Sequence, residues 1–257
     1  MNSVLIRFFQ QVLLVLILSG LSVNLVFAKP EHTSQASGSG KIDSKEQIAK
    51  KNSLANTLTA YFATKVSDLD TTLFRNKDTL ITNNEELAVF TDEKLLPLWS
   101  STRTLQLILG GKRWKSLSPE QIARLENIFS DTFHRYIREG MKYYDGQRVK
   151  VLSVRLNKKL NYGLLTTELT PIYLPKFNIV FKIAKMEQSW QLYDILLEGI
   201  SYVKMKKNEY RKIFIEEGFE ALICHLDKKN RHDIPQSVAE ACNTLGSGCK
   251  TPSSTCG

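Results

Sequence analysis

The chain has 257 residues, 42% of them hydrophobic, and its 35 Lys and Arg against 26 Asp and Glu give a formal net charge of +9. This length and hydrophobic content allow a packed core in one large or two small domains, and 13 Gly and 7 Pro exclude a collagen-like or low-complexity chain. A basic excess attracts anions of several kinds and therefore does not by itself define an activity.

The first 28 residues have the pattern of a secretory signal peptide. Arg7 is the only charged residue in front of an apolar run at residues 12–18, and the segment ends at Ala28 with the small residues that a signal peptidase reads. We therefore expect residues 1–28 to be removed and the rest to be exported as a soluble protein. The alternative is an uncleaved membrane anchor, which the break at Ser19-Gly20 disfavours.

Residues 29–46 begin with a Gly/Ser-rich stretch without periodicity, which predicts a flexible linker. From there we expect one folded domain over residues 47–230 and a mobile, Cys-containing tail over 231–257. Its first element is a long helix, because apolar residues recur every three or four positions from Ile48 to Leu73.

Two shorter helices are predicted next. Thr82 and Glu85 have the spacing of a capping box, which starts a helix that Pro97 ends or kinks. A third helix, over about 99–109, ends at Gly110-Gly111.

The clearest helix start is at Ser118, where Pro119 presets the first turn and Gln121 completes a capping box. The apolar stripe of this helix comprises Ile122, Leu125, Phe129, Phe133, Tyr136 and Ile137. The outer face of the helix carries Arg124, Asn127, Asp131, Arg135 and Arg138. The stripe ends at Gly140.

Beyond residue 146 the apolar period changes from 3.6 to 2. The alternation predicts four strands with short turns, at residues 147–156, 161–170, 177–184 and 189–197. Short turns favour an antiparallel meander with one buried face. Two closing helices follow at about 203–216 and 219–229. The predicted fold is α+β: a helical layer on a mostly antiparallel four-stranded sheet, with two C-terminal helices.

Few residues have a pattern typical of catalysis or metal binding. Asp194 is separated from Trp190 and Leu192 by even numbers of residues, so strand alternation places it on their face of the sheet, where it could be a buried general base. The alternative, which we favour, is a carboxylate that bonds a backbone amide or a nearby cation. The four cysteines, Cys224, Cys242, Cys249 and Cys256, allow three disulfide pairings, and their spacing does not match zinc ligands with His225 or His232.

Basic runs at 204–207, 211–212 and 228–231 are interpreted first as solvated helix faces, and export argues against nucleic acid. A docking surface for acidic proteins or lipid headgroups is the functional alternative. The stripe of residues 122–137 and the strand at 177–183 either form a dry core, which packing favours, or separate around an apolar ligand.

Several motifs resemble the MlaC family, also called toluene-tolerance or auxiliary ABC-transport proteins. They are LILGGKRWKSLSPEQ at residues 107–121, WQLYDILLEGISYV at 190–203, the Asn208-Glu209-Tyr210 triplet and the segment 218–222. The resemblance covers about residues 50–230 in one order.

The resemblance implies a periplasmic carrier without cofactor or enzymatic activity, which holds phospholipid acyl chains between helices and a curved sheet. Its implied partners are an inner-membrane MCE-domain protein of an ABC transporter and an outer-membrane lipoprotein–porin complex, in a system for outer-membrane lipid asymmetry. Some relatives are associated with hopanoids, so a hopanoid-type lipid is a second candidate cargo.

We expect lipid contacts from eight residues: Leu109, Trp114, Phe129, Phe133, Ile179, Phe181, Trp190 and Leu192. Further family-signature residues, several of which we expect to be structural, are Gly110, Pro119, Tyr193, Asp194, Glu198, Gly199 and Ser201. The alternative functions are an exported isomerase-like enzyme that uses Asp194 on a cone-shaped fold and a ligand-free envelope adaptor.

Overall fold

The computed structural model describes residues 41–231 except 173–174 and 188, with side chains from residue 45 onward. The predicted signal peptide, most of the predicted linker and the Cys-containing tail lie outside these residues. Within the described part, no helix is both long enough and apolar enough to cross a membrane.

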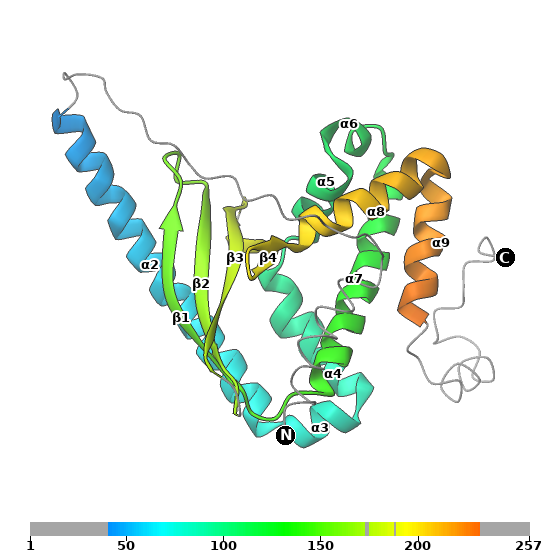
Figure 1. Cartoon of the computed structure of the whole chain (residues 1–257), viewed down its shortest axis with the longest axis horizontal. Helices are drawn as coiled ribbons and strands as arrows, with labels where there is room; N and C mark the ends of the chain where they lie inside the picture. Colours follow the sequence, from blue (N-terminus) through cyan, green and yellow to red (C-terminus); the bar gives the residue numbers. More distant parts are fainter. Residues whose placement is uncertain (1–40, 173–174, 188, 232–257) are drawn as a thin grey trace.

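The fold is α+β, as predicted, and has two walls (Figure 1). One wall is an antiparallel sheet with the long helix α2 (Lys41–Arg75) against it. The other is helical and contains α5 (Ser101–Leu109), α7 (Pro119–Met141), α8 (Tyr202–Glu216) and α9 (Gly218–Arg231). The short helices α3 (Lys77–Thr82) and α4 (Asn84–Phe90) join the walls at the lower end of Figure 1.

Helix α2 begins at Lys41, so residues 41–46 are helical and not part of the linker. The Gly/Ser-rich composition stops at Gly40, and the following residues are mostly good helix formers. Leu58 and Phe62 are buried against Val151 and Val154 of the sheet, and the backbone amide of Val154 donates to the Thr59 hydroxyl at 3.0 Å. This contact fixes α2 along the first strand.

The predicted cap at Thr82 is wrong by one residue. Asn83 is the N-cap of α4 and accepts hydrogen bonds from the amides of Glu85 and Glu86. Thr82 instead ends α3, where its hydroxyl donates to the carbonyl of Asp78 at 2.7 Å. Because the two helices are separated by a single residue, only Asn83 has the extended backbone that a cap requires.

A π-helical turn (Thr91–Leu95) and a 3-10 turn (Leu96–Leu98) connect α4 to α5. Helix α5 ends at Gly110, whose φ of +85° favours glycine and whose missing side chain leaves room for the Arg211 guanidinium. Arg211 donates to the carbonyls of Ile108 and Leu109 and so closes the end of α5. The short helix α6 (Gly111–Trp114) follows, which the sequence pattern did not predict.

Helix α7 confirms the predicted capping box, because Ser118 and Gln121 exchange both expected hydrogen bonds. Arg135, which was predicted on the outer face, is buried instead. Its side chain donates to Asn230 and to Glu139, because α9 packs over that side of α7. The periodicity of one helix cannot show that a second helix covers it.

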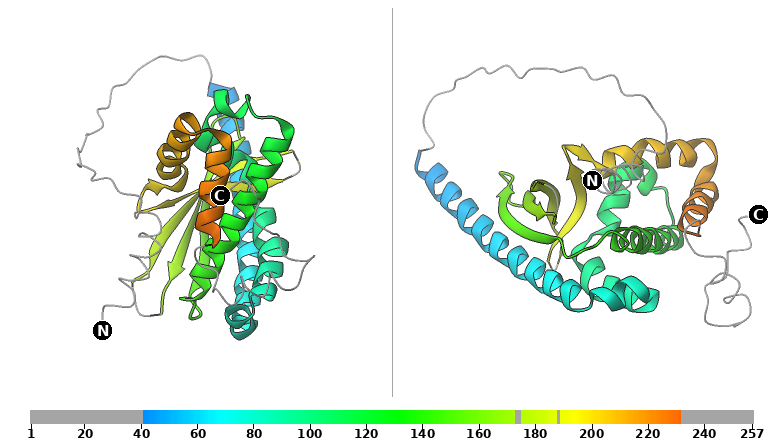
Figure 2. Two further views of the ribbon diagram at one scale, coloured as in Figure 1. Left: turned by 90° about the vertical axis from the view of Figure 1, so that its right-hand side faces the viewer. Right: turned by 60° about the horizontal axis from the view of Figure 1, so that its bottom comes forward.

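The sheet is a meander of β1 (Arg148–Leu156), β2 (Tyr162–Thr170), β3 (Phe177–Lys185), β4 (Trp190–Leu197) and a fifth strand, β5 (Ile200–Ser201). The first four match the prediction. β5 has two residues and follows the turn Glu198-Gly199, where both φ angles are positive as in a tight hairpin. The sheet is strongly twisted and curved (Figure 2).

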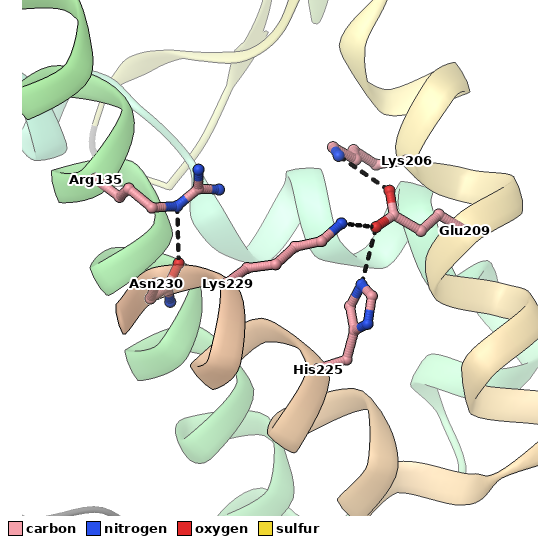
Figure 3. Close-up of polar contacts among 6 residues, drawn as sticks. All are labelled: Arg135, Lys206, Glu209, His225, Lys229 and Asn230. Carbon is pink, nitrogen blue, oxygen red and sulfur yellow. Dashed lines mark hydrogen bonds and ion pairs between the residues drawn. The ribbon is translucent and has the colours of Figure 1, made fainter. Parts of the chain in front are cut away.

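Helices α8 and α9 are joined by a half-buried carboxylate (Figure 3). Glu209 of α8 is paired with Lys206 on its own helix, at 3.0 Å, and with His225 and Lys229 of α9. Burial would raise the pKa of Glu209, but the hydrogen bond from His225 and the two lysines outweigh it and hold the pKa below the ordinary value of 4.5. The ionised carboxylate is therefore part of the helix–helix contact.

We predict that Glu209→Gln lowers the free energy of unfolding at pH 7 by about 2–4 kcal/mol, because it leaves the buried ammonium of Lys206 without its partner. Since the folded pKa lies below the unfolded one, this contribution is complete at neutral pH and is lost as the pH falls below 4.5. Urea unfolding at pH 7 and at about pH 3, well below the unfolded pKa, measures both effects. Glu220→Gln, which removes an exposed pair with Arg124, is the control and should change stability by less than about 1 kcal/mol. If the difference in unfolding free energy between Glu209→Gln and the unsubstituted protein does not change with pH, the ionised carboxylate is not the stabilising group.

Candidate functional site

A cavity of about 500 Å³ lies between the two walls. Helix α2, the segment before α5, helix α7 and the inner face of the sheet all contribute to its lining. The lining residues are Phe62, Lys65, Val66, Leu69, Asp70, Leu73, Leu95, Leu98, Trp99, Phe129, Phe133, Tyr136, Ile137, Gly140, Tyr144, Gln147, Val149, Leu165, Thr167, Leu169, Phe181, Leu192, Ile195 and Tyr202. Most are aliphatic or aromatic, so the cavity suits an apolar ligand.

The sheet lines the cavity with alternate residues. Leu165, Thr167 and Leu169 follow one another at every second position of β2, and Phe181 opposes Leu165 on β3. Trp99 is held beside Leu192 by a backbone bridge, in which the amide of Ser100 donates to the Leu192 carbonyl at 2.7 Å. The cavity is therefore framed by regular backbone pairing.

Four of the eight predicted contact residues line this cavity: Phe129, Phe133, Phe181 and Leu192. Leu109 is buried in the core between α5, α7, α8 and α9, and Trp114 packs against the same core. Trp190 packs against the cluster of α2 and the sheet, and Ile179 is not among the lining residues. The prediction missed the contribution of α2, although Leu69 and Leu73 belong to the apolar pattern that identified this helix.

Polar lining residues gather where α2 and the end of α7 approach the start of β1, at the lower end of Figure 1. They include Asp70, Tyr144 and Gln147. Lys65, which also lines the cavity, lies further from this end, with its ammonium over the Tyr61 ring. Asp70 is 8% exposed and is paired with Arg148 at 2.7 Å. Burial raises the pKa of Asp70, and Arg148 opposes this effect. One end of an otherwise apolar cavity is thus polar.

Three buried donors of the lining have no hydrogen-bond partner among the described residues. They are the indole nitrogen of Trp99 and the hydroxyls of Tyr144 and Tyr202. Since buried polar atoms are nearly always paired, these donors are available to acceptor atoms of a ligand or of water.

Asp194 does not face the cavity, although strict alternation along the strand predicted that it lies on the same side as Leu192. β4 has one extra residue opposite the Lys182–Ile183 step, and this bulge at Tyr193 turns Asp194 to the outer face of the sheet while Leu192 and Ile195 face inward. The Asp194 carboxylate accepts from the Ser201 hydroxyl at 2.7 Å and the Val203 amide at 3.0 Å, and pairs with Lys182 at 2.8 Å. The favoured interpretation, a carboxylate that bonds a backbone amide and a nearby cation, matches these contacts.

The family-signature residues have structural surroundings. Pro119 is in the first turn of α7, Ser201 caps α8, and Glu198 and Gly199 form the β4–β5 turn. None of the predicted signature residues lines the cavity. Cys224 of α9 is disulfide-bonded, while the other three cysteines lie outside the described residues. Within the described ranges, no group of three or more His, Cys, Asp or Glu side chains could hold a metal ion.

Two comparisons with known proteins agree with this architecture. The family model described as "MlaC protein" matches residues 64–228. The chain is also similar to the solved structure of a phospholipid-binding protein from Ralstonia solanacearum in complex with a phospholipid. The identity is 21% and the TM-score 0.59, and the match covers 67% of this chain and 96% of that chain. At this identity the likeness establishes the fold.

We predict that Asp194→Ala destabilises the protein by about 2–4 kcal/mol, because it leaves a helix-terminal amide and a hydroxyl without their acceptor. Asp194→Asn, which keeps the shape of the side chain, should lose less stability than Asp194→Ala. Urea unfolding followed by circular dichroism gives both values. The control, Glu168→Ala, removes the more exposed pair with Lys176 and should stay within about 1 kcal/mol of the unsubstituted protein. Full stability of Asp194→Ala would show that the network is not structural.

Proposed function

Because this chain belongs to the MlaC family, we propose that it is a periplasmic carrier that holds the acyl chains of a phospholipid in the cavity between its two walls. The observation that carries the proposal is the cavity itself, which is large, mostly apolar and formed by both walls. The phospholipid held by the Ralstonia solanacearum protein of similar fold supports the choice of ligand. A hopanoid-type lipid is the second candidate cargo.

The affinity would come from burial of methylene groups. Each contributes about 0.8 kcal/mol, so ten of them would contribute roughly 8 kcal/mol before the entropy of binding is subtracted. We infer that the chains lie against Phe129, Phe133 and Phe181. The headgroup would lie at the polar end, near Tyr144 and Gln147, and the donors of Trp99 and Tyr144 would reach ester oxygens.

We further propose that the protein transfers lipid between membrane complexes. The carrier would exchange lipid with an inner-membrane MCE-domain protein of an ABC transporter and with an outer-membrane lipoprotein–porin complex. The basic faces of α8 and α9 suit acidic docking partners. The sequence pattern of residues 1–28 supports export.

The two rival functions find less support. An isomerase that uses Asp194 would need this carboxylate in the apolar cavity, whereas it points to the opposite face and is 1% exposed. A ligand-free adaptor would need a dry core, whereas a cavity of about 500 Å³ separates the walls.

The direct test is mass spectrometry of the purified mature protein, first in the native state and then after organic extraction. We expect stoichiometric phospholipid, or a hopanoid if that is the cargo. An apo mass combined with no uptake from labelled phospholipid vesicles would overturn the carrier proposal.

Filling the cavity should weaken binding. In Leu169→Trp the indole occupies the space of two to three methylene groups, worth about 2 kcal/mol, so lipid affinity should fall roughly thirtyfold. Leu152→Trp is the matched control, because Leu152 lies on the same sheet but is 40% exposed and does not line the cavity. Equal lipid content in both variants would place the lipid elsewhere.

A further inference from the structure

A second cavity, of about 350 Å³, lies on the outer face of the sheet, between β2–β4 and helices α5 and α8. It shares no lining residue with the first cavity. The alternation of each strand explains this separation. Phe181 and Ile195 face inward, whereas their neighbours Lys182 and Asp194 face the outer cavity. The two cavities therefore lie on opposite faces of the sheet.

The lining of the outer cavity is strongly basic. It contains Arg103, Lys182, Lys204 and Lys207 against the single carboxylate of Asp194, which leaves an excess of three positive charges. Asp194 is engaged by Lys182, Ser201 and Val203 and is almost fully buried, so the cations are the groups that a ligand would meet.

Arg103 is held in position but not neutralised. Its guanidinium donates to the Tyr162 hydroxyl at 3.1 Å and lies over the rings of Tyr162 and Tyr193, 5.4 and 6.0 Å from their centroids. Its Nε atom is buried and has no hydrogen-bond partner among the described residues. Two aromatic rings thus orient a planar cation that lines the cavity and forms no ion pair among the described residues.

Lys204 and Lys207 complete the cationic wall from the first turns of α8. Their ammonium groups form no ion pair or hydrogen bond with a side chain of the described residues. The helix terminus itself is already capped, because Asp194 and Ser201 accept from the amides of Val203 and Lys204. Recognition in this cavity would therefore use side chains and not backbone amides.

We infer that the outer cavity binds a phosphate monoester, with Arg103 as the bidentate donor and Lys204 and Lys207 as charge partners. A doubly charged phosphate matches the excess of positive charge better than a single carboxylate, and the guanidinium fork fits its oxygens. The volume admits a small substituent on the phosphate. Such a group occurs in soluble phosphate esters and in the headgroup of an anionic lipid such as phosphatidic acid.

Calorimetric titration of the mature protein with glycerol 3-phosphate tests the soluble source. Co-sedimentation with phosphatidic acid vesicles, with phosphatidylcholine vesicles as reference, tests the membrane source. We expect saturable binding in at least one of the two assays, weakened by salt. Binding of glycerol 3-phosphate assigns a soluble ester, and preference for phosphatidic acid without soluble binding assigns a headgroup.

Three variants test the residues. Arg103→Gln and the double variant Lys204→Gln, Lys207→Gln should each weaken binding about tenfold or more, the loss expected from one charge-assisted hydrogen bond. The double variant keeps the test valid if Arg103→Gln does not fold. Lys212→Gln is the matched control, since Lys212 is exposed on α8 and does not line the cavity. The lipid extracted from all variants should equal that of the unsubstituted protein, which separates this site from the proposed carrier function.

Three results would overturn the inference. The first is that glycerol 3-phosphate does not bind at about 10 mM and that the protein shows no preference for phosphatidic acid vesicles. The second is binding that both cavity variants retain in full, which would indicate general attraction to a basic protein. The third is binding of an acidic peptide such as oligoglutamate when neither phosphate source binds, which would assign the surface to a protein partner.

Discussion

The cavity depends on the separation of the two walls, which are held apart at both ends. At the lower end, Leu80, Leu87, Phe90 and Met141 form a small core that joins α3, α4 and α7. Where β4 meets α8, Asp194 ties β4 to β5 and to the first turn of α8. Apolar surfaces collapse on each other unless a rigid frame prevents it. These two joints are the frame, and the apolar residues between them remain available to a ligand.

The bulge at Tyr193 gives the sheet two different faces within one short strand. Without the extra residue, strict alternation would place Asp194 on the same side as Leu192, where a carboxylate would be desolvated in an apolar cavity. With it, the carboxylate reaches Ser201, Val203 and Lys182 on the outer face. The same irregularity thus keeps the inner cavity apolar and builds the joint between β4 and α8.

Local patterns predicted most of the fold, because the interactions that fix helix ends and strands are close in sequence. Ser118 and Gln121 form their box as expected, and the four long strands lie where period-2 alternation places them. The errors arise where distant elements decide. Arg135 is buried only because α9 packs on α7, and the direction of Asp194 depends on a register shift against β3. For the cavity, the apolar stripe of α7 identified Phe129 and Phe133. The lining residues of α2 could not be identified in this way, because they depend on how α2 packs on the sheet.

Each wall of the cavity has its own core. Leu58 and Phe62 of α2 are packed with the sheet, whereas α5, α7, α8 and α9 are packed around Leu105, Leu125 and Leu222. An increase in the distance between the walls therefore breaks contacts across the cavity and leaves both cores intact. For the proposed carrier, release of a tightly held acyl chain would require a partner that favours the open state, since a partner shifts such an equilibrium by its difference in affinity for the two states. The lower joint and the Asp194 network are the places where such a partner would act on the distance, because they are the contacts that set it.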